Sequence, residues 1–171
     1  MEDKIDKFIK LSIVGDRNVG KSKLLIRYND DVYSEISYQC VDFITKTYII
    51  NNKNIRVQTW NTTKREQQYL HYKCNFTDSE GIILCYSITD SESFHNLIKW
   101  KENIKIYAQK KVKVILCGTK NDDIMNRQVT LKEGKDFADA NGYEFIEISS
   151  KTGINIELLF TKLINRILNE K

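Results

Sequence analysis

The sequence GDRNVGKS at residues 15–22 satisfies the pattern G-x-x-x-x-G-K-[ST] of a phosphate-binding loop, the P-loop. An apolar, β-branched run precedes it at residues 8–14 (FIKLSIV), and residues 23–28 (KLLIRY) continue as helical turns. The loop is therefore expected between a strand and a helix N-terminus, where backbone N–H groups and the helix dipole favour anions. We expect Lys21 to neutralise the β- and γ-phosphates of a nucleotide and Ser22 to offer its hydroxyl to Mg²⁺.

Composition limits the class of protein. The chain has 171 residues, of which 41% are hydrophobic and 29% charged, so we expect one folded domain over residues 1–171 rather than a disordered chain. No apolar run approaches the ~18 residues of a membrane span, and the N-terminal MEDKIDKF does not resemble a signal sequence. The net charge of +4 comes with lysines interspersed among acids, so nucleic acid is not an expected partner.

The cysteines indicate a reducing compartment. Cys40, Cys74, Cys85 and Cys117 show no C-x-x-C pairing, and the last two lie inside apolar, strand-like runs. Buried free thiols explain this pattern better than disulfides or zinc. A cytoplasmic location is therefore expected.

Strand-like and helix-like segments alternate along the chain in the order β-α-β-β-α-β-α-β-α-β-α. This order predicts an α/β fold with a six-stranded, mostly parallel sheet, one antiparallel strand and about five helices on both faces. Thr130 and Glu133 have the spacing of a capping box. The expected strands are residues 8–14, 41–50 (antiparallel), 55–60, 81–87, 112–118 and 143–148, and the helices beyond the P-loop helix include residues 91–108, 130–140 and 155–168.

A second motif selects the base. Residues 119–122 (TKND) follow a strand and fit [NT]-K-x-D, in which Asp122 would accept hydrogen bonds from guanine N1–H and its exocyclic amine, while the Lys120 stem packs on the ring. Alone, this could be an ordinary polar turn, but ligands bind at the carboxyl ends of parallel strands. Tyr33 is expected to flank the base, and residues 149–151 (SSK) to support it. The full predicted set of nucleotide contacts is Arg17, Asn18, Val19, Gly20, Lys21, Ser22, Lys23, Tyr33, Thr119, Lys120, Asp122, Ser149, Ser150 and Lys151.

Together these motifs resemble the Ras superfamily, and within it the Rab branch. Residues 85–94 (CYSITDSESF), with Asn96 and Trp100, are similar to the Rab pattern V-Y-D-x-T-D-x-E-S-F-x-N-x-x-x-W, and residues 41–43 (VDF) to the end of I-G-V-D-F. The resemblance implies a P-loop G-domain, GDP or GTP with Mg²⁺ as cofactors, and a regulatory role in vesicle traffic at the cytosolic face of endomembranes. It also implies two loops that order around the γ-phosphate.

The second of these loops departs from the family. Where the family pattern is W-D-T-A-G-Q-E, this sequence has WNTTKRE at residues 60–66. Asn61 replaces the Asp that holds a Mg²⁺-bound water, and Lys64 replaces a Gly whose N–H meets the γ-phosphate. Arg65 replaces the Gln that orients the attacking water, and arginine has donors only.

The first loop and the P-loop depart as well. Aligned from residues 41–43, Tyr38 occupies the position of the Thr that coordinates Mg²⁺ when GTP is bound. Arg17 stands where most relatives have a small residue. It could point to solvent, reach the phosphates, or obstruct an incoming arginine finger.

Phe43 and Trp60 could simply be core residues, but partner contacts are expected at exposed aromatics beside the switch loops. Phe43 and Trp60 occupy two of the positions that Rab effectors contact, and Asn75 stands at the third, usually Tyr. A monomer is expected. The sequence contains no C-terminal prenylation signal, so membrane contact would be indirect or through a tail that this sequence does not include.

Three functions are compatible with these residues. The first is a guanine-nucleotide-binding regulator with weak hydrolysis and impaired switching. The second is a competent GTPase in which Arg65 or Arg17 supplies charge in cis. The third is a scaffold that binds no nucleotide.

Overall fold

The protein is built around one six-stranded sheet with the strand order β2-β3-β1-β4-β5-β6. The computed structural model describes residues 4–35, 41–62 and 76–169. Within them, all neighbouring strands are parallel except β2 and β3, which are antiparallel. The prediction of a mostly parallel sheet with one antiparallel strand is confirmed. The strands are β1 (Lys7–Gly15), β2 (Phe43–Ile50), β3 (Lys53–Asn61), β4 (Gly81–Ser87), β5 (Lys113–Thr119) and β6 (Glu144–Glu147).

The β2–β3 hairpin is tighter than the sequence predicts. The strands predicted at residues 41–50 and 55–60 leave four residues between them, but Ile50 pairs with Lys53 and leaves a two-residue loop. Asn51 and Asn52 both have positive φ, 51° and 58°. These are the angles of a type I′ turn, and Asn tolerates them better than most residues. Strand β3 therefore begins two residues before its expected start.

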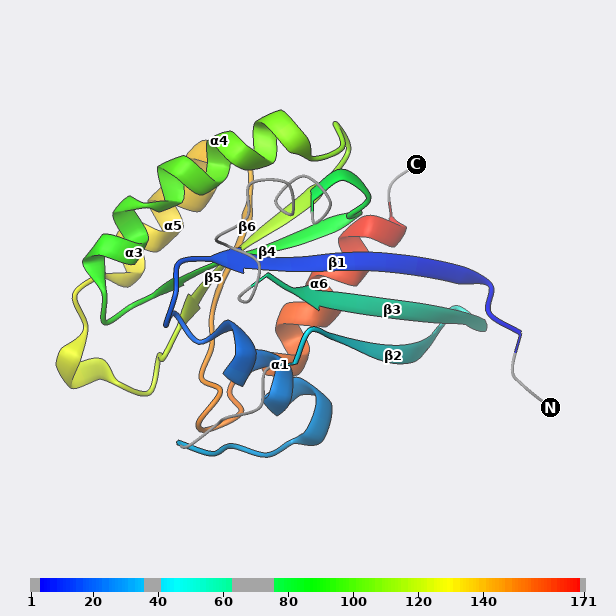
Figure 1. The fold of residues 1–171 in the computed structure, drawn as a ribbon, viewed down its shortest axis with the longest axis horizontal. Coiled ribbons are helices and arrows are strands. Elements are labelled where there is room, and N and C mark those ends of the chain that lie inside the picture. The colour runs from blue at the N-terminus through cyan, green and yellow to red at the C-terminus, as the bar shows by residue number, and fades with distance from the viewer. Residues whose placement is uncertain (1–3, 36–40, 63–75, 170–171) are drawn as a thin grey trace.

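Helices cover both faces of the sheet (Figure 1). Helices α1 (Lys21–Asp30) and α6 (Ile156–Leu168) pack on one face, and α3 (Ser91–His95), α4 (Leu97–Tyr107) and α5 (Leu131–Asn141) on the other. A short 3₁₀ helix, η1 (Ile124–Asn126), follows β5. Thr130 and Glu133 form the predicted capping box at the start of α5.

The single helix expected at residues 91–108 is divided at Asn96. The Asp90 carboxylate caps α3 by accepting from the backbone N–H groups of Glu92 and Ser93. Asn96 ends α3 and immediately precedes α4. Its side-chain amide contacts Asp16, far away in the sequence, and helical periodicity gives no signal for such a contact.

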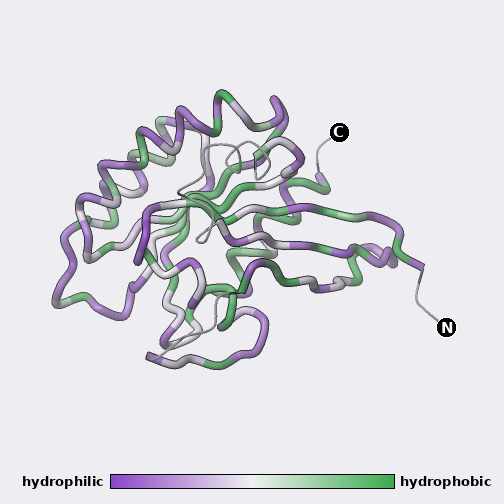
Figure 2. Tube along the Cα trace, in the orientation of Figure 1, coloured by the Kyte–Doolittle hydropathy of each residue, from purple (hydrophilic) through white to green (hydrophobic). Residues whose placement is uncertain are grey.

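The core has two halves, one on each face of the sheet. Ile9, Leu11 and Ile13 on β1 face the α1–α6 side, whereas Val14 and Leu84 pack on the α3–α5 side. Figure 2 shows hydrophobic residues concentrated along the central strands and hydrophilic residues along the outer turns and loops. Such two-sided burial is typical of parallel strands.

Two of the four cysteines lie within the described residues. Cys85 and Cys117 are buried and free, as predicted, on the paired strands β4 and β5. Cys40 and Cys74 lie outside the described residues. No helix in the described parts of the chain is long and apolar enough to cross a membrane.

Adjacent leucines on α6 test this packing. Leu159 is fully buried, whereas its neighbour Leu158 is 46% exposed. Leu159→Ala is expected to lower the free energy of unfolding by about 2–5 kcal/mol, because it removes buried methyl groups and leaves a cavity. Leu158→Ala is the matched control and should stay within about 0.5 kcal/mol of the parent. Denaturant titration measures both, and equal losses would contradict this packing of α6.

Candidate functional site

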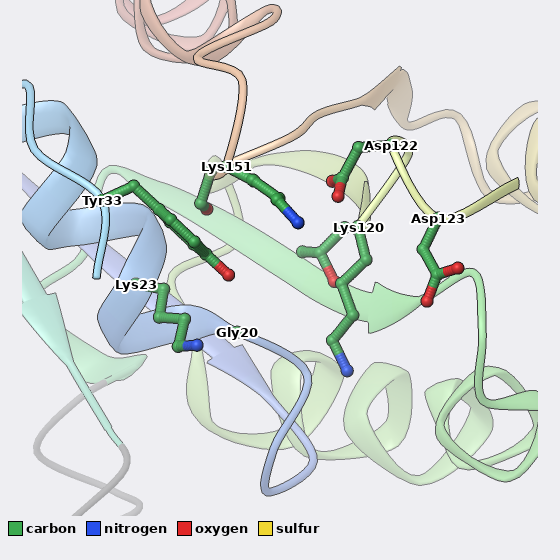
Figure 3. A pocket seen from close by; sticks show the side chains of 9 residues that line it. Gly20, Lys23, Tyr33, Lys120, Asp122, Asp123 and Lys151 are labelled. Carbon is green, nitrogen blue, oxygen red and sulfur yellow. The ribbon is translucent and has the colours of Figure 1, made fainter. Parts of the chain in front are cut away.

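A pocket of about 390 Å³ lies at the carboxyl end of the sheet. Side chains from the P-loop helix, from the segment after α1, from the loop after β5 and from the loop after β6 converge on it (Figure 3). Its lining residues are Gly20, Lys23, Tyr33, Thr119, Lys120, Asp122, Asp123, Ser150 and Lys151. All but Asp123 belong to the set predicted from the sequence.

The P-loop connects β1 to α1 as the sequence predicts. Gly15 has φ of +141°, and a Cβ there would lie 2.2 Å from the Cys85 carbonyl oxygen, so only glycine fits against β4. Gly20, at φ of +99°, precedes the first helical residue. The Lys21 side chain is 2% exposed, and its Nζ donates to the carbonyls of Gly15 and Asp16 at 2.5 and 2.6 Å. The loop thus curls around a buried ammonium group.

A polar contact fixes the P-loop from the other face of the sheet. The Asp16 carboxylate accepts one hydrogen bond from the Asn96 amide at 2.6 Å and another from the Trp100 indole N–H at 2.7 Å. Trp100 is nearly buried, with 6% of its surface exposed. Sequence reasoning placed Asn96 and Trp100 only in a family pattern and missed this role. Their spacing of four residues, one helical turn, places the two side chains near each other but gives no signal that Asp16 is their partner.

The loop after β5 is joined to both neighbouring loops. The Thr119 hydroxyl donates to the Val19 carbonyl in the P-loop. On the other side, the Ser149 hydroxyl donates to Oδ1 of Asp122 at 2.6 Å, and the Asn121 N–H donates to the Ile148 carbonyl. Asp122 is therefore positioned by Ser149, which is fully buried behind the pocket.

An ion pair reinforces this end of the pocket. Arg127, just after η1, donates to both carboxylate oxygens of Glu147 at 2.8 and 2.7 Å. The Glu147 side chain is only 5% exposed, and its hydrogen bond raises the pKa of Arg127. Sequence reasoning did not find this pair. It ties the segment after Asp122 to the end of β6, because bidentate Arg–carboxylate pairs fix geometry as well as charge.

The outer rim carries alternating charges. The Lys23 ammonium lies 5.1 Å from the centroid of the Tyr33 ring and donates to the Glu35 carbonyl at 3.3 Å. From the opposite wall, Lys151 Nζ lies 3.7 Å from the Glu35 carboxylate. Two lysines therefore hold the segment after α1 across the edge of the pocket.

The remaining predicted residues fall into three groups. Lys21, Ser22 and Val19 lie in the P-loop or the first turn of α1 beside the pocket, and Arg17 and Asn18 are exposed on that loop. Phe43 and Trp60 contact each other on β2 and β3. Tyr38, Lys64, Arg65 and Asn75 lie outside the described residues.

Asn61 determines how well the site suits Mg²⁺. The Asn61 amide donates to the Ser22 hydroxyl at 2.9 Å and to the Val41 carbonyl at 3.0 Å. Mg²⁺ is bound by oxygen ligands and commonly by carboxylates. Ser22 offers one such oxygen, but Asn61 directs an N–H donor at it where the family pattern has an aspartate. These two residues do not fit the metal as a hydroxyl–carboxylate pair would. The described residues contain no cluster of three His, Cys, Asp or Glu side chains suited to a metal.

A P-loop on this six-stranded sheet, with a TKND loop at the same edge, defines a P-loop G-domain. A model of the Ras family matches residues 10–169. Among curated proteins, the chain is 38% identical over 171 residues to Ras-related protein RIC1 from Oryza sativa subsp. japonica, covering 99% of this chain and 85% of that protein. It is 35% identical over 169 residues to GTP-binding protein ypt1 from Schizosaccharomyces pombe, covering 98% and 83%. The chain belongs to the Ras family and is a Rab-like member of the Ras superfamily of small GTPases.

The Asp16–Trp100 contact can be tested by a double-mutant cycle. Trp100→Phe keeps an aromatic ring but removes the N–H donor, and the lost bond to a carboxylate should cost about 1.5–3 kcal/mol of unfolding free energy. In an Asp16→Ala background the same substitution should cost at least about 1 kcal/mol less.

Trp60→Phe is the matched control for this cycle. Its indole N–H donates to the neutral Gln58 amide at 2.9 Å, so its loss should be smaller and independent of Asp16. Equal costs of Trp100→Phe in the two backgrounds would show that the carboxylate contact does not stabilise the fold.

Proposed function

We propose that this protein is a Rab-like regulator that binds guanine nucleotide, GDP or GTP, but hydrolyses GTP weakly and switches poorly. Residues 1–171 form, on this proposal, one G-domain that acts as a monomer. The observation that carries the proposal is the contrast within one site. The phosphate-binding and base-binding elements converge on a single pocket, whereas Asn61 presents an amide to Ser22.

The base-binding end supports guanine. Asp122 lines the pocket with its carboxylate held by Ser149. A carboxylate in this place accepts hydrogen bonds from guanine N1–H and the exocyclic amine, whereas adenine offers no such pair of donors. Lys120 and Tyr33 line the same pocket and supply the surfaces that would enclose the ring.

The phosphate end supports a di- or triphosphate. Lys21 already has its ammonium inside the curl of the loop, and the first N–H groups of α1 follow it. No acidic residue occurs in the first turn of α1. An anion there benefits from the helix dipole, from the N–H groups of the first helical turn and from the lysine charge together.

Weak hydrolysis follows from the residues expected around the γ-phosphate. Asn61 lacks the negative charge of the family's aspartate, and Lys64 and Arg65 replace the Gly and Gln of the second loop. An arginine cannot accept a hydrogen bond from the attacking water. Losing the groups that clamp the metal and position the water should cost several orders of magnitude in rate, since one arginine finger alone is worth ~10³–10⁵.

The role in vesicle traffic rests on the Rab likeness and on a surface for partners. The relative ypt1 is named a GTP-binding protein. Phe43 is 46% exposed, and its ring centroid lies 4.7 Å from that of Trp60 on the neighbouring strand. An exposed aromatic ring that packs against a second one is a typical anchor for a protein partner. We propose that effectors or regulators contact this pair at the cytosolic face of endomembranes.

Base selection is tested by Asp122→Asn. The Kd for GDP should rise at least about 100-fold, because two charge-assisted hydrogen bonds are lost. Affinity for xanthosine diphosphate should increase, because the new amide can donate to the xanthine C2 carbonyl. Asp139→Asn on the exposed face of α5 is the control and should leave both values unchanged. Parental protein that binds GDP and ADP equally would contradict the proposal.

Hydrolysis is tested by single-turnover assays on protein loaded with GTP. The parent should be at least about 100-fold slower than a variant carrying Asn61→Asp, Lys64→Gly and Arg65→Gln, because these substitutions restore the groups that position water and charge. Release of inorganic phosphate measures both rates. A parent as fast as this variant would indicate a competent GTPase with charge supplied in cis.

A further inference from the structure

The Asn61 side chain is held in one orientation. Its backbone N–H donates to the Asp42 carbonyl at 2.8 Å, and the next residue, Thr62, donates its hydroxyl to the Ile13 carbonyl at 2.9 Å. Asn61 itself is only 7% exposed. The end of β3 is thus fixed against both β1 and the residue that precedes β2.

The Val41 carbonyl decides which amide atom faces Ser22. A carbonyl oxygen can only accept, so the Asn61 atom 3.0 Å from it must be the NH₂ nitrogen. Rotating the amide by half a turn would place two acceptor oxygens against each other. The same nitrogen lies 2.9 Å from the Ser22 hydroxyl oxygen, which therefore accepts a hydrogen bond.

This arrangement competes with a cation. A metal at Ser22 would share the hydroxyl oxygen with the Asn61 N–H, which uses one of its two lone pairs, and the positive end of the amide dipole would face the ion. A carboxylate at residue 61 would instead attract the ion and accept from the hydroxyl. The Ser22–Asn61 pair therefore weakens the metal site without exposing an unsatisfied group.

Lys23 adds a positive charge to the wall of the pocket, where its ammonium now contacts the Tyr33 ring and the Glu35 carbonyl. It lies on the first turn of α1, one residue after Ser22, and its side chain lines the pocket beside Gly20 (Figure 3). With Lys21 inside the loop, the helix N-terminus carries two lysine side chains and no acidic residue in its first turn. Cations are favourable partners for phosphate wherever they can approach it.

We propose that this protein retains guanine nucleotide without depending on Mg²⁺, because the Asn61 amide satisfies Ser22 and Lys23 supplies charge to the phosphates. The inference rests on the proposed binding of guanine nucleotide, and it adds which groups hold the bound nucleotide in place. Chelation, which releases nucleotide from a metal-dependent site, is then ineffective here.

The experiment follows release of a fluorescent GDP analogue after a chase with unlabelled GDP, in excess magnesium or in EDTA. For the parent, the two rates should agree within about threefold, a difference below 1 kcal/mol. Asn61→Asp should slow release in magnesium and separate the two rates by more than about tenfold. Lys23→Ala should speed release by about tenfold in both conditions, because it removes one charge-assisted contact. Lys53→Ala, on the exposed hairpin end of β3, is the control and should match the parent.

A metal titration makes the test independent of how the variants fold. GDP-loaded parent should bind Mn²⁺, used as a paramagnetic probe for Mg²⁺, no more tightly than free GDP does. Release from the parent that EDTA accelerates more than about tenfold, or Mn²⁺ binding more than about tenfold tighter than to free GDP, would overturn the inference. A parent that binds no analogue in either condition would instead overturn the proposed function.

Discussion

The parallel pairing of β1 with β3 and β4 is the constraint on which the rest of the site depends. Because parallel strands run in the same direction, their carboxyl ends meet at one edge, and the loops that follow β1, β5 and β6 converge there. The end of β1 lies so close to β4 that the residue after the apolar run of β1 must be glycine. A Cβ on Gly15 would collide with the Cys85 carbonyl. A P-loop in this place needs both the sheet and that glycine.

Partly buried polar contacts fix the relative positions of the converging loops. Asp16 joins the P-loop to α3 and α4 through Asn96 and Trp100, and Arg127 joins the loop after β5 to Glu147 at the end of β6. Each contact links segments far apart in the chain at a point where the backbone leaves regular structure. Loops held in this way need not be ordered by the ligand, so less conformational entropy is lost on binding.

Much of this architecture could be predicted from sequence, because the relevant signals are local. The P-loop, the TKND loop and the apolar runs each fit within a dozen residues. They predict the fold, the order of strands and helices along the chain, and most residues that line the pocket. The Asp16–Trp100 and Arg127–Glu147 contacts join residues 84 and 20 positions apart, and no periodicity reports such a pairing. The division of the helix at Asn96 and the early start of β3 were not predicted for a related reason. A side-chain contact decides the first, and the type of turn decides the second.

On the proposed function, Asn61 separates binding of a nucleotide from the conformational response to it. A ligand shifts a conformational equilibrium only by its difference in affinity for the two states. Mg²⁺ and its carboxylate partner are part of what lets a γ-phosphate act on the loops around it, and here an amide already satisfies Ser22. If GDP and GTP are bound by the same lysines and the same base contacts, neither favours one loop arrangement over the other. Bound nucleotide still stabilises the fold, by about 2.7 kcal/mol at a concentration 100 times the Kd. On the proposed function, occupancy of the site therefore matters more to this protein than the number of phosphates, and a partner would recognise a surface that hydrolysis does not change.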